Sequence, residues 1–253
     1  MDRPLAVIIM AAGKGTRMKN PDMAKVMHRI NGRPMIECVV DLALQLDSRI
    51  TVVVVGWQKE SVIAHLQSAQ KNVTFVEQSP QLGTGHAVMQ AEPPLKTFDG
   101  DVLVLSGDVP LLTFETVRAL LEFHRQQSAV ATVLTCILGD ATGYGRVVRT
   151  SDGSVTSIVE QKDATPEQLQ IKEVNSGIYI FDRASLFEAL RWITPTNAQK
   201  EYYLTDVFQY FRKNKSRVSA IPAKDSQEVE GINTVQQLQG IRRKIEKITR
   251  SSS

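Results

Sequence analysis

A glycine-rich, basic loop directly follows the first apolar run of this chain. Gly13 and Gly15 lack Cβ atoms, so the backbone can turn sharply there and its amides can point at anionic oxygens. Lys14 and Arg17 add positive charge, and the Arg17 guanidinium can hold a phosphate with two parallel hydrogen bonds. The residues of this loop, Ala11, Ala12, Gly13, Lys14, Gly15 and Arg17, are therefore candidates for a phosphate site.

The spacing in this loop excludes two common phosphate motifs. A Walker A loop is excluded because GxxxxGK[ST] is absent, and Met18 stands where GxGxxG requires its last glycine. On spacing alone, a purely structural glycine turn is as good an interpretation as phosphate binding. Lys25 becomes a second candidate only because it follows the loop by a few residues.

The segment from Gln78 to His86 is a second polar turn with two glycines. The Gln78 amide could recognise the edge of a base with a donor and an acceptor together. Gly83 allows close backbone approach, and Thr84 offers a hydroxyl. By itself, however, the segment is better interpreted as a tight turn with a helix cap at Thr84.

A carboxylate stands just beyond the apolar run 101–105, in the segment Ser106-Gly107-Asp108. Magnesium prefers one or two carboxylates together with phosphate oxygens and water, so we favour Asp108 as a metal ligand over a turn aspartate. Asn233 offers a second oxygen near the end of the chain. The four histidines lack HxxxH or HExxH spacing, which argues against zinc.

Three further residues could engage the hydroxyl groups of a sugar. Glu160 and Asn175 have side chains that can do so, and Gly145 allows close approach to an amide or hydroxyl. Each is a weak signal alone, because short polar loops are common.

Alternating apolar runs and helical patterns must position these residues. β-branched runs bounded by glycine are typical of buried parallel strands, and helices between them indicate βαβ units with helices on both faces of a sheet. Beyond residue 138 the pattern is mixed, with a hairpin predicted at 146–149 and 155–159 around Ser151-Asp152-Gly153. The other predicted strands are 5–10, 50–55, 73–76, 101–105, 129–136 and 174–181, and the predicted helices are 35–46, 59–69, 85–91, 114–126, 184–192, 203–213 and 234–248.

Bulk properties predict one globular domain over residues 1–253. The net charge is +3, and the basic cluster Arg242-Arg243-Lys244 is interpreted as a solvated helix face, so we expect no nucleic-acid partner. No apolar stretch reaches membrane length, and Cys38 and Cys136 have no paired spacing. Together these features predict a cytoplasmic protein without membrane contact; they leave the oligomeric state open.

The motifs in their order resemble one family, the uridyltransferase domain of bacterial N-acetylglucosamine-1-phosphate uridyltransferases. The resemblance runs from about residue 5 to residue 240 and rests on AAGKGTRM, QLGTGHA, SGDVPL, TGYGR, VEQKDAT, VNSGIY, EYYLTD and VEGIN. It implies an α/β fold: a Rossmann-like mixed, mainly parallel sheet with helices on both faces and a smaller sugar-binding lobe. It also implies transfer of a uridylyl group from UTP to N-acetylglucosamine 1-phosphate, giving UDP-N-acetylglucosamine and pyrophosphate. The resemblance further implies Mg²⁺ as cofactor and a part in the synthesis of a peptidoglycan precursor.

The resemblance implies a role for each candidate residue. The loop of Ala11, Ala12, Gly13, Lys14 and Gly15 would hold the triphosphate, with Arg17 and Lys25 as catalytic residues on its phosphates. Gln78, Gly83 and Thr84 would read the uracil, and Gly145, Glu160 and Asn175 would bind the amino sugar. Asp108 and Asn233 would hold Mg²⁺.

This chain departs from the family pattern in two of its motifs. Met23-Ala24 replaces the usual leucine-proline before Lys25, and Ser106 replaces an aromatic residue that would contact the sugar. Other acceptors, such as glucose 1-phosphate, or a CTP-dependent transfer therefore stay open, as does a non-catalytic nucleotide-sugar binding protein. No hexapeptide repeats follow, so we expect no C-terminal left-handed β-helix acetyltransferase domain.

Overall fold

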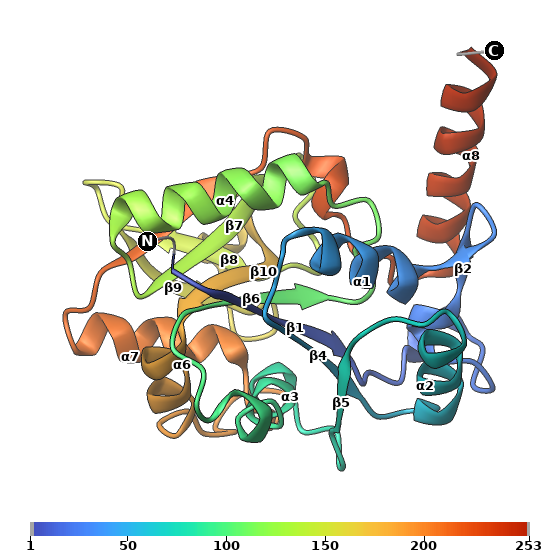
Figure 1. Ribbon diagram of the computed structural model, residues 1–253. Coiled ribbons are helices and arrows are strands. Elements are labelled where there is room, and N and C mark those ends of the chain that lie inside the picture. The colour runs from blue at the N-terminus through green and yellow to red at the C-terminus, as the bar shows by residue number, and fades with distance from the viewer. Residues whose placement is uncertain (1–2, 252–253) are drawn as a thin grey trace.

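The computed structural model describes residues 3–251, and side chains as far as Arg243. Most of its strands belong to one large sheet: β1 (Leu5–Ala11), β4 (Ile50–Val55), β5 (Thr74–Glu77), β6 (Asp101–Ser106), β7 (Ala131–Ile137), β8 (Arg146–Arg149), β9 (Val155–Val159), β10 (Glu173–Asp182) and β11 (Val218–Pro222). The order across it is β11-β7-β10-β6-β1-β4-β5, with β8 joining β10 and β9 to the side (Figure 1). A separate two-stranded ribbon contains β2 (Arg29–Ile30) and β3 (Arg33–Pro34).

The strands around β1 run parallel and end at one edge of the sheet. β1 pairs in parallel with both β4 and β6, which aligns Ala11 with Val55 and Met10 with Ser106. β10 runs antiparallel to β6, so its first residues lie at that same edge. Loops that follow β1, β5 and β6 are thereby brought together with the start of β10, as expected for ligand sites of open α/β sheets.

Helices cover both faces of the sheet, as the sequence predicted. The α-helices of the described residues are α1 (Met35–Gln45), α2 (Lys59–Ser68), α3 (Thr84–Met89), α4 (Phe114–Gln127), α5 (Pro166–Leu169), α6 (Arg183–Leu190), α7 (Val207–Lys213) and α8 (Val235–Ser251). α1, α2 and α4 pack in one apolar cluster with Val7 and Ile9 of β1. α3, α6 and α7 lie on the other side of the sheet (Figure 1) and pack in a second cluster with Ala6 and Ile8. Successive β1 residues therefore serve opposite faces.

The sequence-based boundaries hold to within about two residues for the main elements, and the predicted hairpin is the antiparallel pair β8–β9. Three short elements were missed: the β2–β3 ribbon, α5 and the edge strand β11. β11 pairs in parallel with β7, but most of its residues are only partly buried, so it carries no continuous apolar run. The predicted helix 203–213 is a 3-10 turn, Leu204–Asp206, followed by α7.

α8 projects from the body of the molecule (Figure 1). Its first turns pack through Leu238 and Ile241 against Ile30 and Ile232. Arg242 is exposed, as the solvated-face interpretation requires, but its guanidinium also donates to the carbonyl oxygen of Arg29 at 2.7 Å. The side chain of Lys244 and the terminal residues 1–2 and 252–253 lie outside the described part. Among the described residues, no helix is long and apolar enough to cross a bilayer.

Candidate active site at the carboxyl edge of the sheet

Two adjoining cavities lie at the carboxyl edge of β1 and β6. The larger cavity, of about 520 Å³, is lined by the loop after β1 and by the polar turn after β5. The smaller cavity, of about 300 Å³, is lined by loops around β8, β9 and β10. Thr84, Ser106 and Asp108 line both, so the cavities meet at the end of β6.

Every residue that was assigned a catalytic, substrate-binding or metal-binding role from the sequence lines one of these cavities. The larger cavity contains Ala11, Ala12, Gly13, Lys14, Gly15, Lys25, Gln78, Gly83, Thr84 and Asp108. The smaller contains Arg17, Gly145, Glu160, Asn175, Asn233 and again Asp108. Residues far apart in the chain are therefore brought to one place, with the glycine-rich loop on one side and the proposed sugar-binding groups on the other.

The two glycines of the glycine-rich loop differ in their surroundings: Gly13 faces open space, whereas Gly15 packs against Lys25. A Cβ at Gly13 would meet nothing within 4 Å, so the fold itself does not require glycine there. Gly15 has φ +60°, and a Cβ there would lie 2.5 Å from Cβ of Lys25. Glycine is therefore needed at position 15, both for the positive φ of the turn and because any Cβ there would overlap the Lys25 side chain. Lys14 extends over the Trp57 ring, 5.4 Å from its centroid.

The polar turn after β5 is held by its own backbone and by the segment at Tyr202. Gln78 is buried, and its Nε2 donates to the carbonyl oxygen of Gly83 at 2.8 Å. Tyr202 N donates to Leu82 O at 2.8 Å, and Gly85 N donates to Tyr202 O at 2.7 Å. The Gln78 amide therefore stabilises the turn as well as facing the larger cavity.

Thr84 does not cap the helix that it begins. Gly83 occupies the N-cap position of α3, and no side chain caps that end. The Thr84 hydroxyl instead accepts a hydrogen bond from Leu204 N at 3.0 Å. The helix-cap interpretation of Thr84 was therefore wrong, because the 202–204 segment, distant in sequence, supplies the hydrogen bond.

A cation already sits between Asp108 and Asn233. Nζ of Lys25 is 2.5 Å from Oδ2 of Asp108 and 3.1 Å from Oδ1 of Asn233. Arg17 also donates from Nη2 to Oδ1 of Asn233, at 2.9 Å. The backbone fixes this arrangement, because Ile232 N donates to Asp108 O at 2.9 Å and brings the adjoining Asn233 beside Asp108.

The smaller cavity brings Gly145, Glu160 and Asn175 together. Asn175 N donates to Gly145 O at 2.9 Å, and a Cβ on Gly145 would lie 3.4 Å from both carboxylate oxygens of Glu160. Burial raises the pKa of Glu160, although the Thr205 hydroxyl donates to its Oε1 at 3.3 Å. Asn175 Nδ2 donates to the Tyr179 hydroxyl at 2.7 Å, which orients the amide.

Some lining residues received no role from the sequence. Glu201 lines the larger cavity, and Thr142 and Gln237 line the smaller one. Thr205 acts through its hydrogen bond to Glu160. Glu201 and Thr205 belong to EYYLTD, and Thr142 begins TGYGR. The motifs therefore indicated these segments but did not show which of their side chains line the cavities.

This chain belongs to the nucleotidyl transferase family, whose model matches residues 6–229. It is 49% identical over 228 residues to the bifunctional protein GlmU of Streptococcus pyogenes serotype M12 (strain MGAS2096), covering 89% of this chain and 53% of that protein. The GlmU protein of serotype M5 (strain Manfredo) is also 49% identical, with 89% and 48% covered. The chain thus spans about half the length of the curated relatives it matches.

Solved structures of low sequence identity share the fold. A UDP-glucose pyrophosphorylase complexed with UDP-glucose superposes with a TM-score of 0.78 at 18% identity, covering 98% of this chain and 99% of that one. The apo form of a UDP-glucose pyrophosphorylase gives a TM-score of 0.76 at 19% identity, covering 98% and 100%. The predicted Rossmann-like, mainly parallel α/β sheet is confirmed.

Proposed function

We propose that this chain transfers a uridylyl group from UTP to N-acetylglucosamine 1-phosphate, forming UDP-N-acetylglucosamine and pyrophosphate. The observation that carries the proposal is the meeting of the two cavities at Asp108 and Ser106. A donor in the larger cavity and an acceptor in the smaller one would bring their phosphates together there. The extensive identity to GlmU proteins supports the same reaction.

The reaction is an in-line displacement. A phosphate oxygen of the sugar 1-phosphate forms a bond to the α-phosphorus of UTP, and the bond from that phosphorus to the pyrophosphate oxygen breaks. Because the attacking oxygen is already anionic, no general base is required. The protein contributes by positioning the two substrates and by offsetting negative charge.

Each group of residues has a part in this reaction. The amides of Ala11, Ala12, Gly13, Lys14 and Gly15 hold the triphosphate, while Arg17 and Lys25 offset charge on the departing pyrophosphate. Gln78, Gly83 and Thr84 bind the uracil. Gly145, Glu160 and Asn175 bind the hydroxyl and amide groups of the sugar.

Asp108 and Asn233 fit a magnesium ion. Their side-chain oxygens converge on one ammonium nitrogen, which supports the placement of a cation between them. Magnesium usually keeps several waters and binds one or two carboxylates together with substrate phosphates, so substrate phosphate and water oxygens would complete the coordination. When bound, Mg²⁺ supplies Lewis-acid stabilisation of the phosphate charge.

Pyrophosphate release tests the proposal with the purified chain. UTP, CTP and dTTP are each combined with N-acetylglucosamine 1-phosphate or glucose 1-phosphate. We expect the highest kcat/KM for UTP with N-acetylglucosamine 1-phosphate, and Asp108→Ala should lose most turnover while keeping the parent Tm. Glu115→Ala removes an exposed carboxylate outside both cavities and should keep full turnover. Near-normal turnover by Asp108→Ala would remove the metal assignment.

Glucose 1-phosphate is the alternative acceptor, because Ser106 stands where the family has an aromatic residue that would contact the sugar. A higher kcat/KM with that acceptor would establish the alternative. Binding of UTP without any turnover would instead indicate a nucleotide-sugar binding protein. The cytoplasmic location and the absence of nucleic-acid partners stay predictions.

A further inference from the structure

Lys25 lies on the oxygens assigned to the metal. Its ammonium is 2.5 Å from Oδ2 of Asp108 and 3.1 Å from Oδ1 of Asn233. The Lys25 and Asp108 side chains are only 17% and 13% exposed, so water screens this pair weakly. The ammonium is therefore a well-placed occupant of the metal position.

The glycine-rich loop directs Lys25 to this position. A Cβ on Gly15 would lie 2.5 Å from Cβ and 3.1 Å from Cγ of Lys25, so the lysine stem packs directly against the loop backbone. Lys25 lines the larger cavity while its ammonium reaches Asp108, which lines both. Lys25 thus stands between the loop that would bind phosphate and the carboxylate that would bind metal.

Two cations cannot share this position. A divalent ion on Asp108 and Asn233 would come within a few ångströms of the Lys25 ammonium and be repelled by it. Arg17 adds further positive charge, because it also donates to Asn233. A triphosphate in the larger cavity would change this balance, since its oxygens offer the flexible lysine alternative anionic partners.

We propose that Lys25 blocks the metal site in the absence of nucleotide. Its ammonium occupies the position between Asp108 and Asn233 until a bound triphosphate offers it other anionic partners. The inference rests on the proposed function, because the triphosphate is the donor of that reaction. Metal binding is then weak in the nucleotide-free protein and is coupled to nucleotide binding. Lys25 has two successive sets of partners, first the side-chain oxygens and then the phosphates.

Mn²⁺ binding without nucleotide tests the inference independently of turnover. Free Mn²⁺ is measured by electron paramagnetic resonance during titration of the wild type, Lys25→Met, Lys25→Arg and Lys14→Met. If Lys25 occupies the site in nine-tenths of molecules or more, Lys25→Met should bind Mn²⁺ about tenfold more tightly or better. Lys25→Arg keeps the charge and should stay close to the wild type. Lys14→Met removes equal charge from the same cavity without touching Asp108 and is the matched control.

Equal Mn²⁺ affinity in the wild type and Lys25→Met overturns the inference, as does an equal gain in Lys14→Met. Thermal unfolding of each variant checks the fold, and Lys25→Gln replaces the methionine variant if that protein does not fold. If the proposed function is wrong, the wild type forms no uridine diphosphate sugar. That result leaves the Mn²⁺ affinities of the variants unchanged, and equal Mn²⁺ affinities do not prevent product formation, so the two failures can be distinguished.

Discussion

Arg17 is an exposed residue whose guanidinium reaches the junction of the two cavities. Among the described residues it donates one hydrogen bond in the site, to Oδ1 of Asn233 at 2.9 Å, so we expect the fold not to depend on it. Arg17→Ala should lower kcat/KM by about 100- to 1,000-fold, because a preorganised positive group no longer offsets charge on the departing pyrophosphate. Steady-state pyrophosphate release measures this loss.

Lys19→Ala is the control for Arg17, because it removes an exposed positive charge two residues away that lines neither cavity. It should retain the parent kcat/KM, and Arg17→Ala should retain the parent Tm. An Arg17→Ala enzyme with an unchanged rate would exclude Arg17 from the mechanism.

Single residues show where sequence reasoning reaches its limit. The glycine-rich loop, Asp108 and Asn233 were identified from residue type and order, and they do converge. The sequence could not predict that Gln78 also holds its own turn through Gly83, or that Lys25 bridges Asp108 and Asn233. Such contacts join residues up to 208 positions apart and follow only from the packed fold.

At the scale of elements, strong local signals were sufficient for prediction and weak ones were not. β1 is a continuous apolar run and β4 is apolar apart from Thr51; both strands are buried on both faces, and both were predicted. β11 was missed because it is a half-buried edge strand whose pairing with β7 is its main support. The β2–β3 ribbon has two-residue strands, too short to show any period.

The turn that begins α3 provides a test at the same scale. Gly83 has φ +108°, and a Cβ there would lie 2.6 Å from the carbonyl oxygen of Tyr202. Gly83→Ala should therefore lower the free energy of unfolding by about 2 kcal/mol and raise KM for UTP. Urea unfolding and initial-rate measurements give the two quantities.

Gly13→Ala is the matched substitution for Gly83→Ala. A Cβ at Gly13 would meet nothing within 4 Å, so the free energy of unfolding should stay close to that of the parent. KM for UTP should still rise, because the added methyl group enters the larger cavity. If both substitutions lowered the free energy of unfolding equally, the inference that the fold requires Gly83 but not Gly13 would be wrong.

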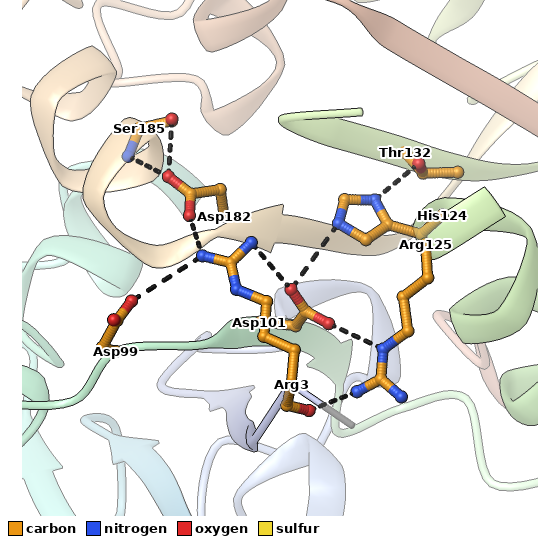
Figure 2. Close-up of polar contacts among 8 residues, drawn as sticks. All are labelled: Arg3, Asp99, Asp101, His124, Arg125, Thr132, Asp182 and Ser185. Carbon is orange, nitrogen blue, oxygen red and sulfur yellow. Dashed lines mark hydrogen bonds and ion pairs between the residues drawn. The ribbon is translucent and has the colours of Figure 1, made fainter. Parts of the chain in front are cut away.

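At the scale of the whole molecule, a buried ion cluster ties the sheet together at the edge opposite the site. Asp101 begins β6, is 1% exposed, and lies between Leu5 of β1 and Asp182 of β10 in register. Arg125 of α4 donates from Nε to Oδ2 of Asp101 at 3.0 Å, and Arg3 approaches Oδ1 at 3.3 Å (Figure 2). One carboxylate thus joins the N-terminal segment, the central strands and a covering helix.

The cluster extends beyond Asp101 through both of its arginines. Arg3 also donates to Asp182, whose Oδ1 caps α6 by accepting from Ser185 N at 2.8 Å (Figure 2). Arg125 also donates to the carbonyl oxygen of Arg3. Loss of the central carboxylate would therefore leave permanent guanidinium charges without their most buried partner.

Asp101→Asn should lower the free energy of unfolding by about 3 kcal/mol, because it breaks a buried ion pair while keeping the shape of the side chain. For a chain of this length the midpoint of thermal unfolding should fall by roughly 6 to 12 °C. β6 spans roughly 17 Å from Asp101 to Ser106, which lines both cavities, so kcat at 20 °C should stay near the parent value.

Asp99→Asn is the control for Asp101→Asn. It removes the fully exposed carboxylate 3.8 Å from the same Arg3 and should leave the midpoint of thermal unfolding unchanged, because solvent screens that pair. Equal midpoints for Asp101→Asn and the parent would mean that packing alone holds this edge, and a lower kcat with an intact midpoint would mean that the cluster influences the site across the sheet.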